Sequence, residues 1–151
     1  MKSSRAIGMR RGQRTQKGVV SFELVGYLVV LGLLAFVVFQ KSEYIYDTAR
    51  IWIFKYQVGE VSSAVIEVSQ GNTTAGIDMD KIKDTTPSWI GDGTNAVVFG
   101  GNFTVAAGTE PYSYVISADQ MPVRVGHRIA AGWDQATYDE SSKIMNVSYG
   151  L

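Results

Sequence analysis

The chain has no cysteine and only three prolines among its 151 residues. Without cysteine it forms neither a disulfide nor a thiolate metal site, so any folded part must be stable through packing alone. No proline lies between Val19 and Gln70, and Gly26, Gly32 and Gly59 are the only glycines there. Because proline breaks helices, its absence allows this stretch to form one long helix.

Acidic residues are absent from positions 1–18. This leader carries six basic residues: Lys2, Arg5, Arg10, Arg11, Arg14 and Lys17. The remaining chain has eight basic and 14 acidic residues, a formal net charge of −6. Since basic segments stay on the cytoplasmic side of a membrane, we expect residues 1–18 in the cytoplasm and the C-terminal part across the membrane. The position of the leader favours topology over nucleic-acid binding as the role of its charge.

An apolar run of about 22 residues follows the leader, and up to Gln40 it contains one formal charge, Glu23. About 20 apolar helical residues span the hydrocarbon core of a bilayer. A secretory signal would have a shorter apolar core and a cleavage site after it. Here the candidate cleavage site, Gly18, precedes the run. Cleavage there would leave the helix on the mature protein, with Val19 first and Glu23 fifth.

This junction of Lys17, Gly18, Val19, Glu23 and an uninterrupted apolar segment resembles the class III signal of type IV prepilins and pseudopilins. It is most similar to the type IVb branch, of the conjugative thin-pilus or toxin-coregulated type. The resemblance implies cleavage after Gly18 by prepilin peptidase, N-methylation of Val19, and an assembly role for Glu23. In that role, Glu23 pairs with the freed amine of Val19 on a neighbouring subunit.

Downstream of Lys41 the apolar residues narrow to a stripe with spacings of three and four: Ile51, Phe54, Val58, Val61, Val65 and Val68. Such spacing indicates one buried helical face. We therefore predict one helix of about 50 residues, with its first half in lipid and its second half against a domain. Gly71 and Asn72 are expected to end it.

Beyond this helix the pattern indicates short strands, with a polar connection over 77–88 that contains about one helical turn. Strands are predicted at 95–99, 102–106, 112–117 and 145–149, and a second helix at 122–131 after Pro122. A half-apolar sheet needs a cover, which the stripe supplies. The prediction is an α+β fold with a long N-terminal helix packed on a small antiparallel sheet, as in pilins. The segment 100–133 is also similar to the middle of conjugative thin-pilus pilins.

Four regions are expected: a cleaved leader at 1–18, a transmembrane and polymerisation half of the helix at 19–42, its amphipathic half at 43–72, and a globular head at 73–151. We expect no enzyme, since nothing resembles a nucleophile–base pair, a phosphate loop or a carboxylate cleft. Asp78, Asp80 and Asp84 suggest a calcium loop, but interleaved lysines favour a solvated connection. His127 is expected at the surface, and no metal or cofactor is predicted.

The resemblance implies a structural subunit of an extracellular pilus that serves adhesion, aggregation or conjugation. Its expected partners are copies of itself through residues 19–70, prepilin peptidase and the pilus assembly platform. It would lie in the bacterial inner membrane before assembly, with no nucleic acid involved. Two alternatives stay open: a minor pilin or type II secretion pseudopilin, and an uncleaved single-pass protein that anchors a binding or enzymatic domain.

Overall fold

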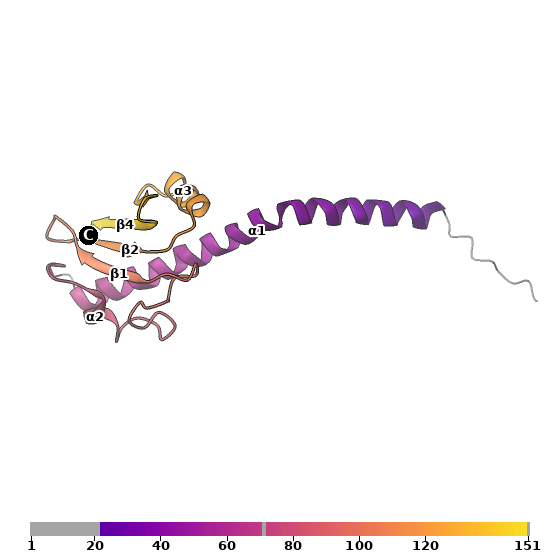
Figure 1. The fold of residues 1–151 in the computed structure, drawn as a ribbon. Coiled ribbons are helices and arrows are strands. Elements are labelled where there is room, and N and C mark those ends of the chain that lie inside the picture. The colour runs from indigo at the N-terminus through magenta and orange to yellow at the C-terminus, as the bar shows by residue number, and fades with distance from the viewer. Residues whose placement is uncertain (1–21, 71, 151) are drawn as a thin grey trace, which may run out of the picture. The chain divides into compact units, whose positions relative to one another are not determined.

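The computed structural model describes residues 22–70 and 72–150. These residues divide into two compact units between Lys41 and Ser42, and the first helix runs through both. The elements are α1 (Phe22–Ser69), α2 (Met79–Ile82), β1 (Phe103–Ala107), β2 (Ser113–Ala118), α3 (Val123–Ala131), β3 (Ala136–Asp139) and β4 (Ile144–Gly150). Figure 1 shows them in chain order. The predicted α+β fold, a long helix on a small antiparallel sheet, is confirmed.

The sheet has four antiparallel strands in the order β1-β2-β4-β3. Its register aligns Phe103 with Ala118, Ala118 with Met145, and Met145 with Tyr138. Since side chains alternate between the faces of a strand, this row and its equivalents point to one face. That face carries the buried side chains of the core, whereas Thr104 and other alternate residues lie on the opposite face.

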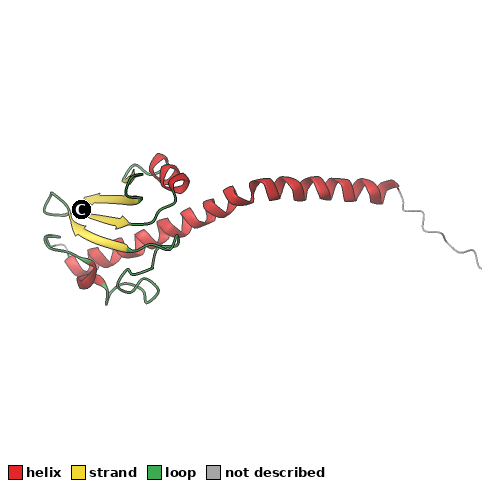
Figure 2. Ribbon diagram, in the orientation of Figure 1, coloured by secondary structure: helices red, strands yellow, loops and turns green. Residues whose placement is uncertain are grey.

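Residues 42–69 of α1 lie along the apolar face of the sheet (Figure 2). The predicted stripe is confirmed, because Phe54, Val58, Val61 and Val65 are fully buried. Its two end residues, Ile51 and Val68, are partly buried and pack on the same core. The helix is therefore an integral part of the core of this unit, as the spacing of its apolar residues requires.

Polar side chains of α1 also bond directly to the head. The Gln57 side chain donates to the Ala96 carbonyl oxygen at 2.7 Å and accepts from the Val98 amide at 2.9 Å. The hydroxyls of Ser62 and Tyr114 share a hydrogen bond of 2.6 Å in the interior. Because buried polar groups need partners, these bonds fix both the rotation and the axial position of α1 on the sheet.

The predicted strand at Asn95–Phe99 is wrong, since this segment consists of turns and bends. The Gln57 side chain bonds to the Ala96 carbonyl and the Val98 amide, the backbone groups that would otherwise pair with a neighbouring strand. The segment also bends back on itself, because the Val97 amide donates to the Gly101 carbonyl at 3.0 Å. Strand β3 was not predicted, whereas β1, β2 and β4 lie within one or two residues of the predicted strands.

The second predicted helix is confirmed as α3, which begins after Pro122 and ends before Gly132. Its buried residues include Gly126, where an added Cβ would lie 2.5 Å from the Tyr138 ring. A side chain at this position would therefore prevent α3 from approaching β3 so closely. The one expected helical turn between 77 and 88 is α2.

Candidate functional site

The predicted processing residues Gly18 and Val19 lie outside the described residues. Glu23, the predicted assembly residue, lies in the first turn of α1 and is exposed. A carboxylate in the first turn interacts favourably with the positive end of the helix dipole. The geometry leaves this carboxylate accessible from outside the chain, as a pairing role with another molecule would require.

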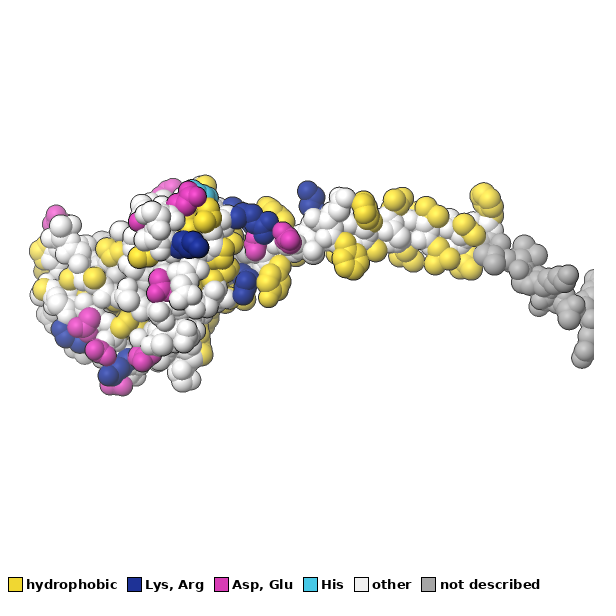
Figure 3. All heavy atoms as spheres, in the orientation of Figure 1, with side chains coloured by type: hydrophobic (Ala, Val, Ile, Leu, Met, Phe, Trp, Pro, Cys, Tyr) yellow, Lys and Arg dark blue, Asp and Glu magenta, His cyan; other side chains and the backbone are white. Residues whose placement is uncertain are grey.

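The part of α1 that follows Glu23 is apolar on every side. Its large hydrophobic residues between Phe22 and Phe39 are 45% to 95% exposed. Figure 3 shows them covering this stretch of the helix. The most apolar 18 residues have a mean hydropathy of 2.5, so by length and composition α1 is a helix that can cross a membrane. Such a surface requires either lipid or other apolar helices around it.

Comparisons of the chain with protein-family models, curated proteins and solved structures found no match. The function of the site therefore has to be argued from its residues and their geometry.

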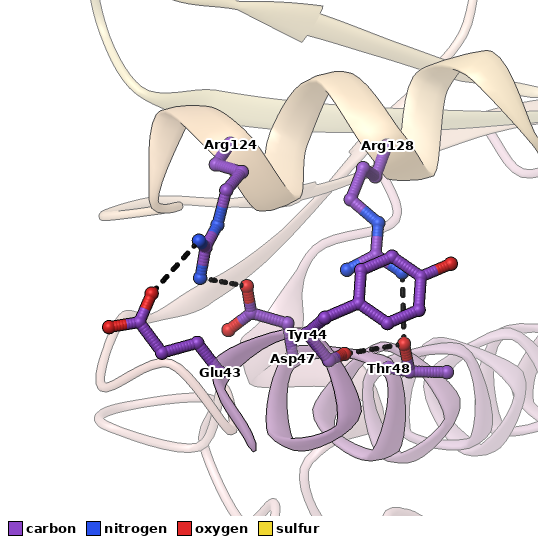
Figure 4. Close-up of polar contacts among 6 residues, drawn as sticks. All are labelled: Glu43, Tyr44, Asp47, Thr48, Arg124 and Arg128. Carbon is purple, nitrogen blue, oxygen red and sulfur yellow. Dashed lines mark hydrogen bonds and ion pairs between the residues drawn. The ribbon is translucent and has the colours of Figure 1, made fainter. Parts of the chain in front are cut away.

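A second cluster of functional interest joins α1, at the start of the second compact unit, to α3. We call it the α1–α3 clamp, and Figure 4 shows its residues: Glu43, Tyr44, Asp47, Thr48, Arg124 and Arg128. Arg124 bonds to Glu43 at 3.1 Å and to Asp47 at 2.5 Å. These two hydrogen bonds raise the pKa of the Arg124 guanidinium, because they favour its charged form. The Asp47 side chain is only 13% exposed, which strengthens its half of the contact.

Arg128 forms the other half of the clamp. Its Nη2 donates to the Thr48 hydroxyl at 2.9 Å, and its guanidinium carbon lies 4.2 Å from the centre of the Tyr44 ring. Thr48 in turn donates to the Tyr44 carbonyl oxygen at 2.7 Å. One guanidinium nitrogen of Arg128, Nη1, is buried without a hydrogen-bond partner. The stacking over Tyr44 is a cation–π contact that compensates part of this desolvation.

Sequence reasoning missed the clamp, although its signal is in the sequence. Arg124 and Arg128 are four residues apart, as are Glu43 and Asp47. Residues four apart share one face of a helix. An acidic pair on one helix and a basic pair on another therefore indicate that these two helix faces lie against each other. The clamp ties α3 to α1 without a covalent bond, in a chain that has no cysteine.

The remaining candidates have local roles. The Asp78 carboxylate caps α2 by accepting from the Lys81 amide at 3.0 Å, and Asp80 lies 3.6 Å from the Lys83 ammonium. Within residues 22–70 and 72–150, no three acidic or histidine side chains converge as metal ligands. His127 is exposed on α3, as predicted, and its Nε2 lies 3.2 Å from Glu140. These contacts support a solvated connection at 77–88 and a surface position for His127.

Proposed function

We propose that the chain is a structural subunit of an extracellular type IVb-like pilus. It is processed by prepilin peptidase after Gly18, methylated at Val19, and polymerised through its N-terminal helix. It resides in the bacterial inner membrane until the assembly platform draws it into the fibre. The polymer surface then serves adhesion, aggregation or conjugation.

One observation carries this proposal. A single helix, α1, has an apolar surface on every side up to Phe39 and then supplies the core stripe of an α+β head. A membrane anchor alone would require only the first property, and a soluble domain only the second. A subunit that leaves the bilayer for a helical fibre requires both, because its apolar segment must exchange lipid for neighbouring helices.

The position of Glu23 adds a second argument. A carboxylate in the interior of a bilayer costs about 2.5 kcal/mol or more at the midplane, so such residues are rare and usually functional. In a fibre with its apolar helices packed together, an unpaired carboxylate would be similarly unfavourable. Pairing it with the amine of Val19 on a neighbour removes that penalty in one register only, and thereby selects the correct register.

Processing tests the proposal directly. Co-expression with a prepilin peptidase should shorten the chain by about 2 kDa, the mass of 18 residues. Edman sequencing and intact mass of the product should show Val19 at its amino terminus, with an added methyl group. Gly18→Leu should block the cut, while Gly18→Ala, which keeps a small side chain, should preserve it. A chain that keeps residues 1–18 in peptidase-competent cells would exclude the pilus function and leave a single-pass anchored domain.

Assembly is tested separately with Glu23→Ala. We expect normal cleavage and membrane insertion, but at least a tenfold loss of filaments in the sheared fraction. Glu23→Asp retains the charge and should restore part of the yield. Abundant filaments from Glu23→Ala would refute the pairing role. A wild-type chain that is cleaved but scarce in sheared filaments would favour a minor pilin or pseudopilin.

A further inference from the structure

Helix α1 carries a second stripe of apolar and small residues between Ser42 and Ser69, on the side that faces away from the head. We call it the outer stripe: Ile45, Ala49, Trp52, Tyr56, Gly59, Ser63 and Ile66. All seven residues are exposed. At 100° per residue, this set lies roughly opposite Phe54, Val58 and Val61 of the core stripe.

The spacing of the outer stripe is alternately four and three residues throughout. This is the spacing of a seam between two helices, in which side chains of one helix insert between those of the other. Solvent-exposed helical faces of a soluble domain are normally polar. Here Trp52 is 72% exposed and Tyr56 is 61% exposed. The two residues lie one turn apart on the same face.

Trp89 widens this apolar surface. Its ring stacks on Tyr56, with a centroid distance of 6.0 Å and an interplanar angle of 14°, and it is itself 48% exposed. An aromatic residue has roughly 150 to 250 Å² of surface, so these three rings expose on the order of 350 Å². That is nearly half of the ~800 Å² that each partner contributes to a stable protein interface. The flanking isoleucines extend the area further.

The outer stripe is complementary to itself. Its largest side chains, Trp52 and Tyr56, are followed by two small residues, Gly59 and Ser63. At Gly59 an added Cβ would meet no other atom within 4 Å, so the backbone there forms an open notch. One helix therefore carries both a projecting ring and a notch that can receive one. On one face, this permits a closed antiparallel pair, in which each copy's Trp52 meets the other's Gly59, or an open, parallel and staggered contact. Subunits drawn in one orientation from a membrane into a fibre require the parallel contact.

Lipid is a poor occupant of this surface. Charged residues occur throughout this half of α1, including Glu43, Asp47, Glu60 and Glu67. Glu60 and Glu67 lie beside the outer stripe, and burial of carboxylates in the hydrocarbon region is costly. A protein surface with a matching seam, bordered by water, accommodates both the rings and the carboxylates.

We propose that the outer stripe docks a second copy of this chain, with Trp52 of one copy inserted at the Gly59 notch of the next. The inference rests on the proposed pilus function, because it takes the stripe as a contact between successive subunits. It adds the surface, the polarity of the contact and the two residues that meet.

Cysteine cross-linking tests the contact without removal of any native cysteine, since the chain has none. Full-length Trp52→Cys and Gly59→Cys chains, with tags of different size, are co-expressed with the assembly machinery and oxidised in filaments. We expect a mixed dimer of the two variants, because facing cysteines with Cα atoms about 4.4 to 6.8 Å apart form disulfides. Trp52→Cys co-expressed with Thr104→Cys, an exposed position of β1 on the opposite face of the sheet, should remain monomeric.

A second variant fills the notch. Gly59→Trp should lower filament yield at least tenfold without destabilising the subunit, because a Cβ at this exposed helical position meets no atom within 4 Å and glycine is the less favourable residue in a helix. Thr104→Trp adds a large side chain away from the stripe and should leave filament yield within twofold of wild type. Abundant filaments from Gly59→Trp would overturn the inference.

The outcomes separate the two proposals. Filaments that lack the mixed dimer of the Trp52→Cys and Gly59→Cys chains, or that cross-link the Thr104→Cys control equally, would overturn the docking contact and leave the pilus function standing. A selective mixed dimer in membranes of cells where the leader is retained and no filaments form would exclude the pilus function. In that case the contact stands as a dimer interface. Absence of the mixed dimer in both settings overturns the contact.

Discussion

Residues 22–41 and residues 42–150 differ in where their apolar side chains find partners. In the first region, large hydrophobic residues such as Leu31 are exposed on every side of the helix. In the second region, 21 hydrophobic residues are buried in one cluster that α1 shares with the sheet, α2 and α3. Both regions are rich in valine and aromatic residues, so apolar content alone does not separate them.

Arrangement along the sequence makes the difference. Uniform apolarity suits an environment that is apolar in all directions, such as lipid or a bundle of helices. A stripe spaced by three and four suits a single surface within the same chain. The first region therefore depends on partners outside the chain, and the second is stable by its own contacts. The following predictions test that separation.

Truncation should give the largest effect. A fragment that starts at Ser42 retains the core stripe and the clamp, and should be a soluble domain with one cooperative thermal transition by circular dichroism. A fragment that starts at Asn72 loses Phe54, Val58, Val61 and Val65, all fully buried. Together these four contribute on the order of 10 kcal/mol of burial, comparable with the whole stability of a domain. The shorter fragment should therefore be unfolded.

Reductant provides a control, because a cysteine-free domain should keep its melting temperature in its presence. A cooperative transition from the fragment that starts at Asn72 would show that α1 is dispensable for the core, and the distinction between the two regions would then fail.

A matched pair of alanine substitutions sharpens the comparison within one helix. Phe54 is fully buried and stacks on Phe103 with ring centroids 6.1 Å apart. Phe54→Ala should therefore lower the free energy of unfolding by about 3 to 5 kcal/mol. Leu31→Ala removes an exposed side chain and should change it by less than about 0.5 kcal/mol. Urea denaturation of both full-length variants in the same detergent measures the difference, and similar losses would contradict the separation.

The elements that the sequence predicted correctly depend on local patterns. The core stripe follows from the spacing of Phe54 and Val58 along one helix, and α3 follows from Pro122 at its start. The false strand at 95–99 has an apolar pattern, but its Ala96 carbonyl and Val98 amide bond to Gln57, some 40 residues away. No local signal contains that contact. Strand β3 has only four residues, too few to establish an alternating pattern, and it is a strand because it pairs with β4.

The candidate site was predictable to a similar degree. The sequence placed Glu23 near the start of the long helix, and the structure places it in the first turn of α1. Gly18 and Val19 lie outside the described residues, so their roles stay predictions. The α1–α3 clamp and the outer stripe required the fold, because only the position of the sheet shows which faces of α1 are occupied.

The clamp should give a smaller effect than the core. Arg124→Ala removes both contacts to Glu43 and Asp47 at the start of the head unit, and should lower the melting temperature by about 2 to 5 °C. The loss should shrink in 1 M salt, because the Arg124 and Glu43 side chains are mostly exposed and salt screens their contact, whereas the contact to the more buried Asp47 is screened less. Arg124→Lys keeps the charge without the two-pronged geometry and should recover only part of the loss. An unchanged melting temperature would mean that packing alone holds α3 on α1.

The smallest effect is expected at Asp139, the last residue of β3, beside the turn that leads to β4. Hydrogen bonds from the Ser141 and Ser142 hydroxyls, and then from the Ser141 amide, lower the pKa of this carboxyl from 3.8 to about 2. A lowered folded-state pKa stabilises the head above the unfolded value, and this contribution is lost as the pH falls from about 3.8 to about 2.

Replacing both serines by alanine, in Ser141→Ala and Ser142→Ala, should move the pKa of Asp139 back towards 3.8, because two of the hydrogen bonds to its charged form are removed. Carboxyl ¹³C titration by NMR in the fragment that starts at Ser42 measures it. Asp92, whose pKa is lowered by hydrogen bonds from Thr94, is the internal control and should keep its midpoint. A wild-type midpoint near 3.8 for Asp139 would show that the turn is not held by these bonds.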